Sequence, residues 1–263
     1  MVHSLLKKIR VFWILGRIRA LERLENRGQF FIFSVSSIIW LIVSIMFYGV
    51  LIKNYGSLGG WGFYEMVVLS GVINFIINFG FAFWERSFFR MSQNVVGGKI
   101  DIILTKPVEA KFFLTFFNMD FIFSWPQIIF PIGIMIFGII KSEAHVNPVM
   151  FILTLLLSLI LNFSIHRFVT SINFFQPTGG SDSFLVGRIL DLGHYPKGIY
   201  NSVWRNALTF VIPVLFVFTF PVEVLFGKTK ESDYIFFLII VGVFYYLSGK
   251  FMDYGIKHYE SKS

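Results

Sequence analysis

The chain of 263 residues is 56% hydrophobic and only 14% charged, and its mean hydropathy is +0.71. Soluble domains carry about a quarter charged residues, so this composition excludes a soluble enzyme and a disordered chain. The absence of cysteine excludes disulfide frameworks, thiolate metal sites and cysteine nucleophiles, whereas the net charge of +8 must be explained by where the basic residues lie.

The N-terminal segment is predicted to form an amphipathic helix over residues 5–27 that lies in the membrane interface. One sector of this helix is free of charge, and the basic residues lie elsewhere on its surface. We expect residues 1–29 to be a cytoplasmic interfacial helix, and the alternative is a helix that also contacts a cytoplasmic partner. The uncharged sector contains Leu5, Leu6, Ile9, Phe12, Trp13, Gly16 and Ala20.

Six long apolar runs follow this segment. A helix needs about 20 apolar residues to cross ~30 Å of hydrocarbon, and backbone groups in lipid must bond within the segment, which favours helices over strands. We therefore predict an all-α integral membrane protein, with a six-span domain over residues 30–254 and a cytoplasmic tail over 255–263. The runs are 30–52, the stretch between 65 and 85, 112–140, 146–166, and the stretches between 205 and 223 and between 233 and 250.

The basic residues set the predicted orientation. Nineteen of the 23 Lys and Arg residues fall before the first run or in every second connection after it. Positively charged loops stay in the cytoplasm, so both termini are predicted to be cytoplasmic, together with the loops 85–111 and 176–205. This topology, with attraction to anionic lipid, accounts for the net charge without nucleic acid.

The loop 85–111 contains a predicted short helix. Gly97 and Gly98 interrupt the chain, Asp101 follows near a helix start, where a carboxylate favours the positive dipole end, and Pro107 ends the helix. We expect one or two turns that form a rigid plug for a groove on another protein. The alternative is a helix that lies on lipid. The side chains that we expect it to expose are Ile100, Ile103 and Leu104.

Catalytic chemistry is not expected in this chain. It contains no G-x-x-x-x-G-K-[ST] phosphate-binding loop and no HExxH, and its five histidines lack metal-ligand spacing. Asp120 and Glu223 are the acids at membrane depth. Because burying an acid in a membrane is costly, Asp120 is a candidate for lining a transport pathway, and the alternatives are solvation at the membrane interface and a local hydrogen bond. Pro213 is predicted to kink the fifth run.

Three segments resemble six-span permeases of the ABC-2 class of ABC exporters. Residues 97–107 are similar to that family's G-x-x-D-x-x-L-x-[RK]-P segment, residues 167–175 to its stretch after span four, and residues 195–213 to its stretch into span five. The likeness covers nearly the whole chain in order and spacing. The residues that carry it include Gly97, Gly98, Asp101, Leu104, Lys106 and Pro107 in the first segment, Arg167 in the second, and Tyr195, Pro196, Tyr200 and Arg205 in the third.

This resemblance implies a permease subunit without ATPase activity in the bacterial cytoplasmic (inner) membrane. It implies two copies of a separate ATP-binding subunit that carry ATP and Mg²⁺, no cofactor in this chain, and a second permease, identical or related. The loop 85–111 would then couple the ATPase to the spans. The apolar composition favours a hydrophobic or amphipathic substrate. The alternatives are an ion-coupled secondary transporter, which would show inverted repeats and paired acids, and a non-transporting membrane scaffold.

Overall fold

The computed structural model describes residues 2–24, 27–106, 108–142 and 147–259. Within these residues the chain is helical, and its one β-bridge, between Leu58 and Trp61, is isolated. Five helices are long and apolar enough to cross a membrane, which confirms an all-α integral membrane protein. These are α2 (Arg27–Tyr55), α3 (Phe63–Gly80) continued through the π-helical turn η1 (Phe81–Glu85) into α4 (Arg86–Val96), α7 (Trp125–Ser142), α8 (Pro148–Ser171) and α12 (Glu231–His258).

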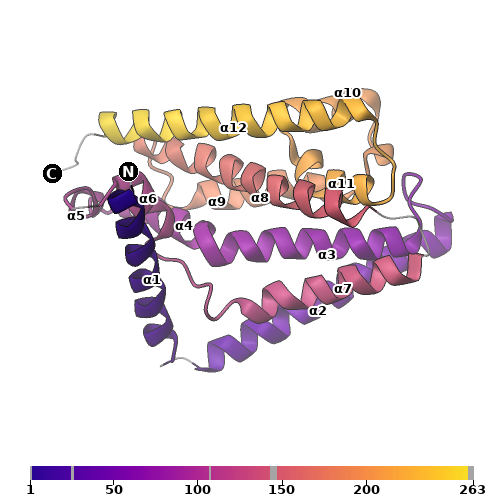
Figure 1. Cartoon of the computed structure of the whole chain (residues 1–263), viewed down its shortest axis with the longest axis horizontal. Helices are drawn as coiled ribbons and strands as arrows, with labels where there is room; N and C mark the ends of the chain where they lie inside the picture. Colours follow the sequence, from indigo (N-terminus) through magenta and orange to yellow (C-terminus); the bar gives the residue numbers. More distant parts are fainter. Residues whose placement is uncertain (1, 25–26, 107, 143–146, 260–263) are drawn as a thin grey trace.

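The remaining elements precede or connect these long helices. Figure 1 shows α5, α6 and the C-terminal end of α12 at one end of the bundle, called the α5 end below, and the turn from α2 to α3 at the other, called the loop end. The remaining elements are α1 (Val2–Leu24), α5 (Ile100–Leu104), α6 (Ala110–Phe116), η2 (Ile172–Phe174), α9 (Ser181–Asp191), η3 (Leu192–His194), η4 (Lys197–Ile199), α10 (Ser202–Asn206), η5 (Ala207–Val211) and α11 (Val214–Leu225).

Helix α1 crosses the direction of the long helices at the α5 end (Figure 1). The ring of Phe12 stacks on those of Phe83 and Phe121, with centroids 6.4 and 5.6 Å apart. Leu6, Trp13 and other apolar side chains of α1 are exposed. An apolar surface on a helix that lies across the spans would suit an interfacial position, which stays a prediction.

The segment predicted as the fifth span is a bent pair of helices. Residues 202–211 and 214–225 meet at an angle of 97°, at Pro213, whose ring removes a backbone donor and breaks the helix. Both flanks of the pair lie at the loop end, because a Cβ on Gly198 would meet Gly59 O at 2.5 Å and Lys228 Nζ bonds Gly60 O at 3.1 Å. The pair therefore enters and leaves the bundle at the same end, and the prediction of one continuous crossing between 205 and 223 is wrong.

The predicted cytoplasmic loop 176–205 also requires correction, since its two halves lie at opposite ends of the bundle. Asp182 accepts a hydrogen bond from Ser92 of α4 at 3.0 Å near the α5 end, whereas Gly198 packs on Gly59 at the loop end. Helix α9 lies between them, so the chain crosses the bundle here. Because α9 contains the charged residues Arg188 and Asp191, it does not form a long apolar run, and the apolar runs of the sequence therefore do not indicate this crossing.

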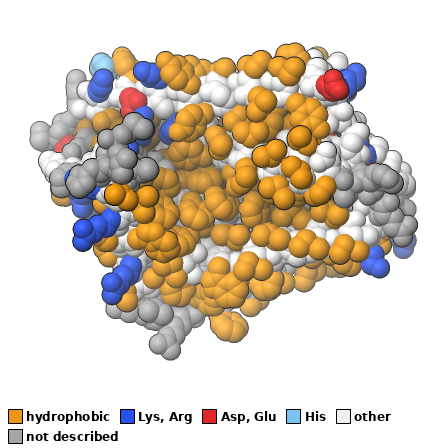
Figure 2. Space-filling view, in the orientation of Figure 1, with side chains coloured by type: hydrophobic (Ala, Val, Ile, Leu, Met, Phe, Trp, Pro, Cys, Tyr) orange, Lys and Arg blue, Asp and Glu red, His pale blue; other side chains and the backbone are white. Residues whose placement is uncertain are grey.

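Burial follows the same architecture. All twelve residues of α11 are buried, and the main core cluster joins α3, α8, α11 and α12. Figure 2 shows hydrophobic side chains across the middle of the visible face, with Lys and Arg side chains gathered at the two ends of the molecule. A face of this kind suits contact with hydrocarbon between two layers of lipid headgroups.

Candidate functional site

The turn from α4 to α5 depends on its two glycines. Gly97 caps α4, its N–H bonding Gln93 O at 3.0 Å, and Gly98 has φ +64°, a left-handed conformation that favours glycine. Lys99 N–H then bonds Asn94 O at 2.9 Å. The chain reverses within three residues as a result, and α5 is placed against α4.

Helix α5 agrees with the prediction in position but not in the face that it exposes. Asp101 lies in the first turn of α5, as expected. Its carboxylate is near the hydroxyl of Tyr259, and burial together with this negative charge raises the pKa of that hydroxyl. Ile100 and Ile103 are buried, whereas Ile102 is 67% exposed. A helix of five residues has too few internal hydrogen bonds to be stable alone, so its apolar side packs onto α4 and α6 instead of facing outward.

The remaining residues of the predicted coupling segment are only partly described. Lys106 lies with its ammonium 4.9 Å from the ring centroid of Phe113 in α6, and Leu104 is the last residue of α5. Pro107 lies outside the described residues. The segment from Gly97 to Lys106 is thus a single unit at the α5 end, supported by a small apolar cluster that includes Met252 of α12.

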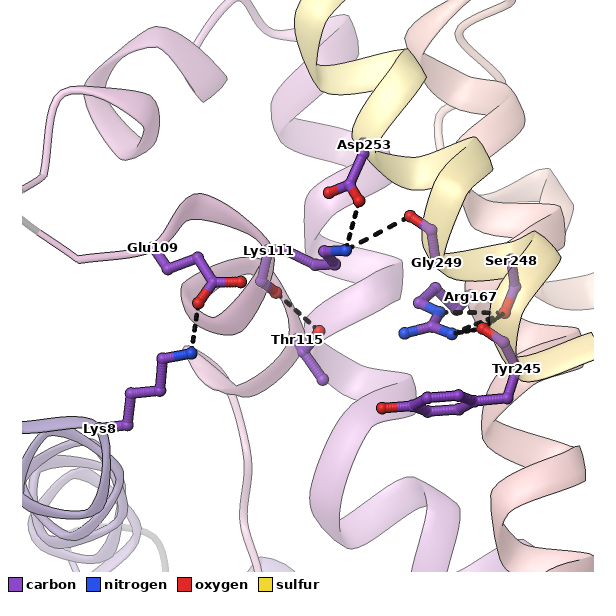
Figure 3. A network of polar contacts seen from close by, with 9 residues as sticks. All are labelled: Lys8, Glu109, Lys111, Thr115, Arg167, Tyr245, Ser248, Gly249 and Asp253. Carbon is purple, nitrogen blue, oxygen red and sulfur yellow. Dashed lines mark hydrogen bonds and ion pairs between the residues drawn. The ribbon is translucent and has the colours of Figure 1, made fainter. Parts of the chain in front are cut away.

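Polar contacts connect α6, the helix that follows this segment, to α1 and α12 (Figure 3). Lys8 of α1 forms an ion pair with Glu109, the residue before α6. Lys111 of α6 places its ammonium 2.6 Å from Asp253 Oδ2 and 3.4 Å from Gly249 O, both on α12. Helix α6 is therefore attached to the interfacial helix on one side and to the last long helix on the other.

Arg167 lies within α8 and is 5% exposed. Its Nε and Nη2 donate to Ser248 Oγ at 3.1 and 2.8 Å, and Nη2 also donates to Tyr245 O. The guanidinium lies 4.8 Å from the ring centroid of Phe163. Arg167 thus joins α8 to α12 next to Lys111, as Figure 3 shows.

The third group of predicted residues lies elsewhere. The ring of Tyr195 packs edge-on against that of Tyr48 of α2, with 6.4 Å between the ring centroids. Tyr200 donates a hydrogen bond to Leu192 O, and Pro196 is the residue before η4. Arg205 is exposed on α10. These four residues belong to the loop end, so the structure does not bring them together with residues 97–106.

Three cavities follow one another along α3 and its continuation through η1 into α4, with α2 and α9 contributing to parts of their walls. Their volumes are about 410, 360 and 470 Å³ from the α5 end toward the loop end. Phe81 and Arg86 line both the first and the second, and Trp40 and Asn78 line both the second and the third. We refer to these connected cavities as the groove. The groove was not predicted from the sequence. The one signal that could have indicated it is the recurrence of Ser70, Asn74 and Asn78 every four residues along α3, as expected for one helix face.

The charged side chains of the groove are concentrated near the α5 end, where Arg86 also reaches the middle cavity, and Asp191 lines the cavity at the loop end. Near the α5 end, His166 Nε2 lies 3.2 Å from Glu85 Oε1, and Arg86 forms an ion pair with Asp120. Asp120 is 6% exposed, and the side chain that lines the groove at this pair is that of Arg86. The carboxylate of Asp120 therefore supports Arg86, and its role in a pathway stays a prediction.

No group of three or more metal-ligating acids or histidines occurs within the part of the chain that the structure describes. At the α5 end, ion pairs and hydrogen bonds connect the helices to one another. The groove could hold a molecule that forms hydrogen bonds with its polar side chains. A family profile described as "ABC-2 family transporter protein" matches residues 38–263. No curated protein matches the chain.

Proposed function

The chain belongs to the ABC-2 transporter family, and from this premise we propose that it is the permease subunit of an ATP-driven exporter. Permeases of this family are membrane subunits that generally lack enzymatic activity and associate with an ATP-binding subunit. In the proposed assembly, two copies of that subunit bind ATP and Mg²⁺, and this chain supplies the path for a hydrophobic or amphipathic substrate and holds no cofactor.

The groove is the observation that carries this proposal. It extends from Arg90 near the α5 end to His194 near the loop end, and so follows most of the length of the bundle. Serine and asparagine side chains line two of its cavities together with the apolar side chains of Ile73, Ile77 and Phe81. A path of this composition suits a molecule with one polar and one apolar side.

A second permease would complete the path. The groove is an open depression along α2. Exposed side chains occur along most of this helix, and that of Trp40 is 68% exposed. A second copy or a related chain that packs against this face would close the groove and keep lipid away from its polar side chains. We therefore place the second permease on the face formed by α2 and α9.

The α5 end is the proposed docking point for the ATP-binding subunit. The exposed side chains here include the apolar Val96 and Ile102 and the basic Lys99 and Lys106. The exposed acid Glu109 is paired with Lys8. A force applied to α5 would reach α12 through Lys111 and Asp253. In this proposal the α5 end faces the cytoplasm of a bacterial inner membrane. The excess of basic residues at this end supports that orientation, even with Lys197 and Arg205 at the loop end.

Purification of the chain from its native membrane tests this proposal. We expect an ATP-hydrolysing subunit to co-purify, and ATP, with no ion gradient, to drive transport in reconstituted vesicles. Transport sustained by an ion gradient without ATP would identify a secondary carrier and refute the proposal. An isolated chain to which no ATP-hydrolysing subunit binds would refute it as well and would favour a scaffold.

A further inference from the structure

The cavity of 470 Å³ at the loop end of the groove has a distinctive set of polar groups. Its walls come from α2, α3 and the end of α9, and its volume falls in the range of sites for small organic ligands. Among the described residues that line it, Asp191 has the only formal charge at neutral pH, and His194 places Nδ1 3.9 Å from Asp191 Oδ1. The aromatic side chains in the lining are Trp40 and Tyr48.

The hydroxyl protons in this cavity are already used by the backbone. Ser37, Ser44 and Ser70 donate to Ser34 O, Trp40 O and Met66 O at 2.9, 2.8 and 3.0 Å, and Tyr48 donates to His194 O at 3.0 Å. A hydroxyl has a single proton but two lone pairs. These four groups can therefore only accept hydrogen bonds from a molecule in the cavity.

The two asparagines continue this pattern. The amide nitrogen of Asn74 donates to Ser70 O at 2.9 Å, and that of Asn78 donates to Asn74 O at 2.7 Å. Because each amide nitrogen points to a backbone carbonyl of α3, the amide oxygen of the same side chain points away from that backbone carbonyl. Each amide nitrogen keeps one N–H that these bonds do not use, and Trp40 has an indole N–H. Beside these donors, the walls of the cavity present four hydroxyl oxygens, two amide oxygens, one carboxylate and the faces of aromatic rings.

Such walls select for a ligand with hydrogen-bond donors and positive charge. An ammonium group has several N–H donors and no acceptor, it is attracted to a carboxylate, and it binds favourably over the face of a tryptophan or tyrosine ring. The nearest basic group to Asp191 is Arg188, with 3.5 Å between Nη1 and Oδ2, and both side chains are more than half exposed. An exposed pair of this kind is weak, so it leaves the carboxylate available to a ligand.

We propose that the loop-end cavity binds the ammonium group of an amphipathic amine, with Asp191 as its counter-charge and Ser44, Ser70 and Asn74 as hydrogen-bond acceptors. This inference rests on the proposed function, because it treats the groove as the path of the substrate. It narrows the substrate class from amphipathic molecules in general to those with a cationic, donor-rich end.

A binding assay on the full-length chain in phosphatidylcholine nanodiscs tests the proposal with three matched probes. Dansylcadaverine carries a primary amine, its N-acetyl derivative has the same body without charge, and dansyl-6-aminohexanoate carries a carboxylate in place of the amine. Binding is followed by fluorescence anisotropy against protein-free nanodiscs. We expect the wild type to bind the amine about tenfold more tightly than either other probe, as one partly exposed charge pair allows.

Two variants locate the site, and a third serves as the control. Asp191→Asn keeps the shape and removes the charge, so the preference for the amine should fall to about twofold or less, and Ser44→Ala should weaken amine binding about threefold. Glu22→Gln is the matched control. Like Asp191, Glu22 is an exposed carboxylate paired with an arginine three residues earlier, but it lies on α1, and its removal should change nothing.

The proposal is overturned by equal binding of the amine and its N-acetyl derivative, by tighter binding of the carboxylate, by a preference that survives Asp191→Asn, or by binding of none of the three probes. The assay contains no ATP-binding subunit and no ATP. Its failure therefore leaves the proposed function intact. Failure of the ATPase to co-purify, with the amine preference present, would refute the proposed function alone.

Discussion

The ammonium of Lys111 lies 2.6 Å from Oδ2 of Asp253, and this contact joins two helices through residues that are 142 positions apart in the sequence. Lys111 belongs to α6, which follows the short helix α5 directly, and Asp253 lies in the last two turns of α12. One turn earlier on α12, Ser248 accepts two hydrogen bonds from Arg167 of α8. A displacement of the α5–α6 segment would therefore be transmitted to two of the long helices.

The contribution of this ion pair to function can be separated from its contribution to stability. The side chains of Lys111 and Asp253 are 25% and 44% exposed, and pairs of this kind contribute about 0–1 kcal/mol to folding. We expect Lys111→Gln to leave the thermal midpoint within about 2 °C while it lowers ATP-driven transport per ATP hydrolysed several-fold. The measurement is the ratio of the two rates in reconstituted vesicles.

The charge-reversed double variant controls this experiment. Lys111→Asp combined with Asp253→Lys restores an attraction between the same two helices, and it should recover a large part of the coupling that each single variant loses. If the double variant is no better than the single ones, or if Lys111→Gln transports as the wild type does, the pair does not transmit motion.

We expect Arg167 to contribute more to the free energy of unfolding than the ion pair of Lys111 and Asp253 does. Its guanidinium is 5% exposed and bonds Ser248 and Tyr245 O, so Arg167→Gln leaves buried acceptors without a charged donor, at a cost of about 2–4 kcal/mol. Ser248→Ala removes only one neutral partner and should cost about 1 kcal/mol. Thermal unfolding in one detergent measures both. Equal losses for the two variants would show that the charge at Arg167 has no special weight.

The exposed side of α5 predicts which substitutions disturb docking of the ATP-binding subunit. Ile102 is 67% exposed, so Ile102→Asp should leave the fold intact and weaken co-purification of that subunit about tenfold or more, whereas Ile102→Leu should preserve it. Asp101→Asn should lower substrate-stimulated ATP hydrolysis, because Asp101 lies in the first turn of the same helix. Normal hydrolysis and co-purification for Ile102→Asp and Asp101→Asn would exclude α5 from the contact.

The bent pair α10–α11 makes a topological prediction that the absence of native cysteine allows to be tested cleanly. Single variants Lys53→Cys, Ile199→Cys and Lys230→Cys should all react with a membrane-impermeant maleimide from the same side. Lys106→Cys should react only from the other side. A single continuous span between 205 and 223 would instead place residues 199 and 230 on opposite sides, and labelling of that kind would rule out the hairpin.

The corrections to α5 and α9 have a common physical origin. The pattern Ile100, Ile103, Leu104 indicates an apolar helix side correctly, but it does not say whether that side meets water, lipid, a partner or another part of the same chain. The structure buries Ile100 and Ile103 in a cluster with Met91 and Phe113. Likewise, Arg188 and Asp191 lower the apolar character of α9 below that of a span, and contacts with α4 and α8 still place it across the bundle.

The groove is the clearest feature that no local pattern predicts. Ser37 and Ser44 belong to α2, Asn74 and Asn78 to α3, and Asp191 to α9, and each is an ordinary polar residue within its own segment. Their common function as a lining exists only because three helices pack side by side. The spacing of Ser70, Asn74 and Asn78 indicates one polar helix face, and it does not reveal what that face meets.

The sequence by itself determined the all-helical membrane class, the apolar runs and the sharp bend at Pro213. These follow from local properties: the thickness of hydrocarbon, the need of the backbone to bond within each segment, and the missing N–H of proline. Only the tertiary structure decided that residues 202–225 return to the end they entered, that α5 turns Ile102 outward, and that α2, α3 and α9 enclose a groove. Each of these features depends on contacts between segments distant in the sequence, such as that of Gly198 with Gly59. At such contacts the free energy of tertiary packing outweighs the local conformational preference of each segment.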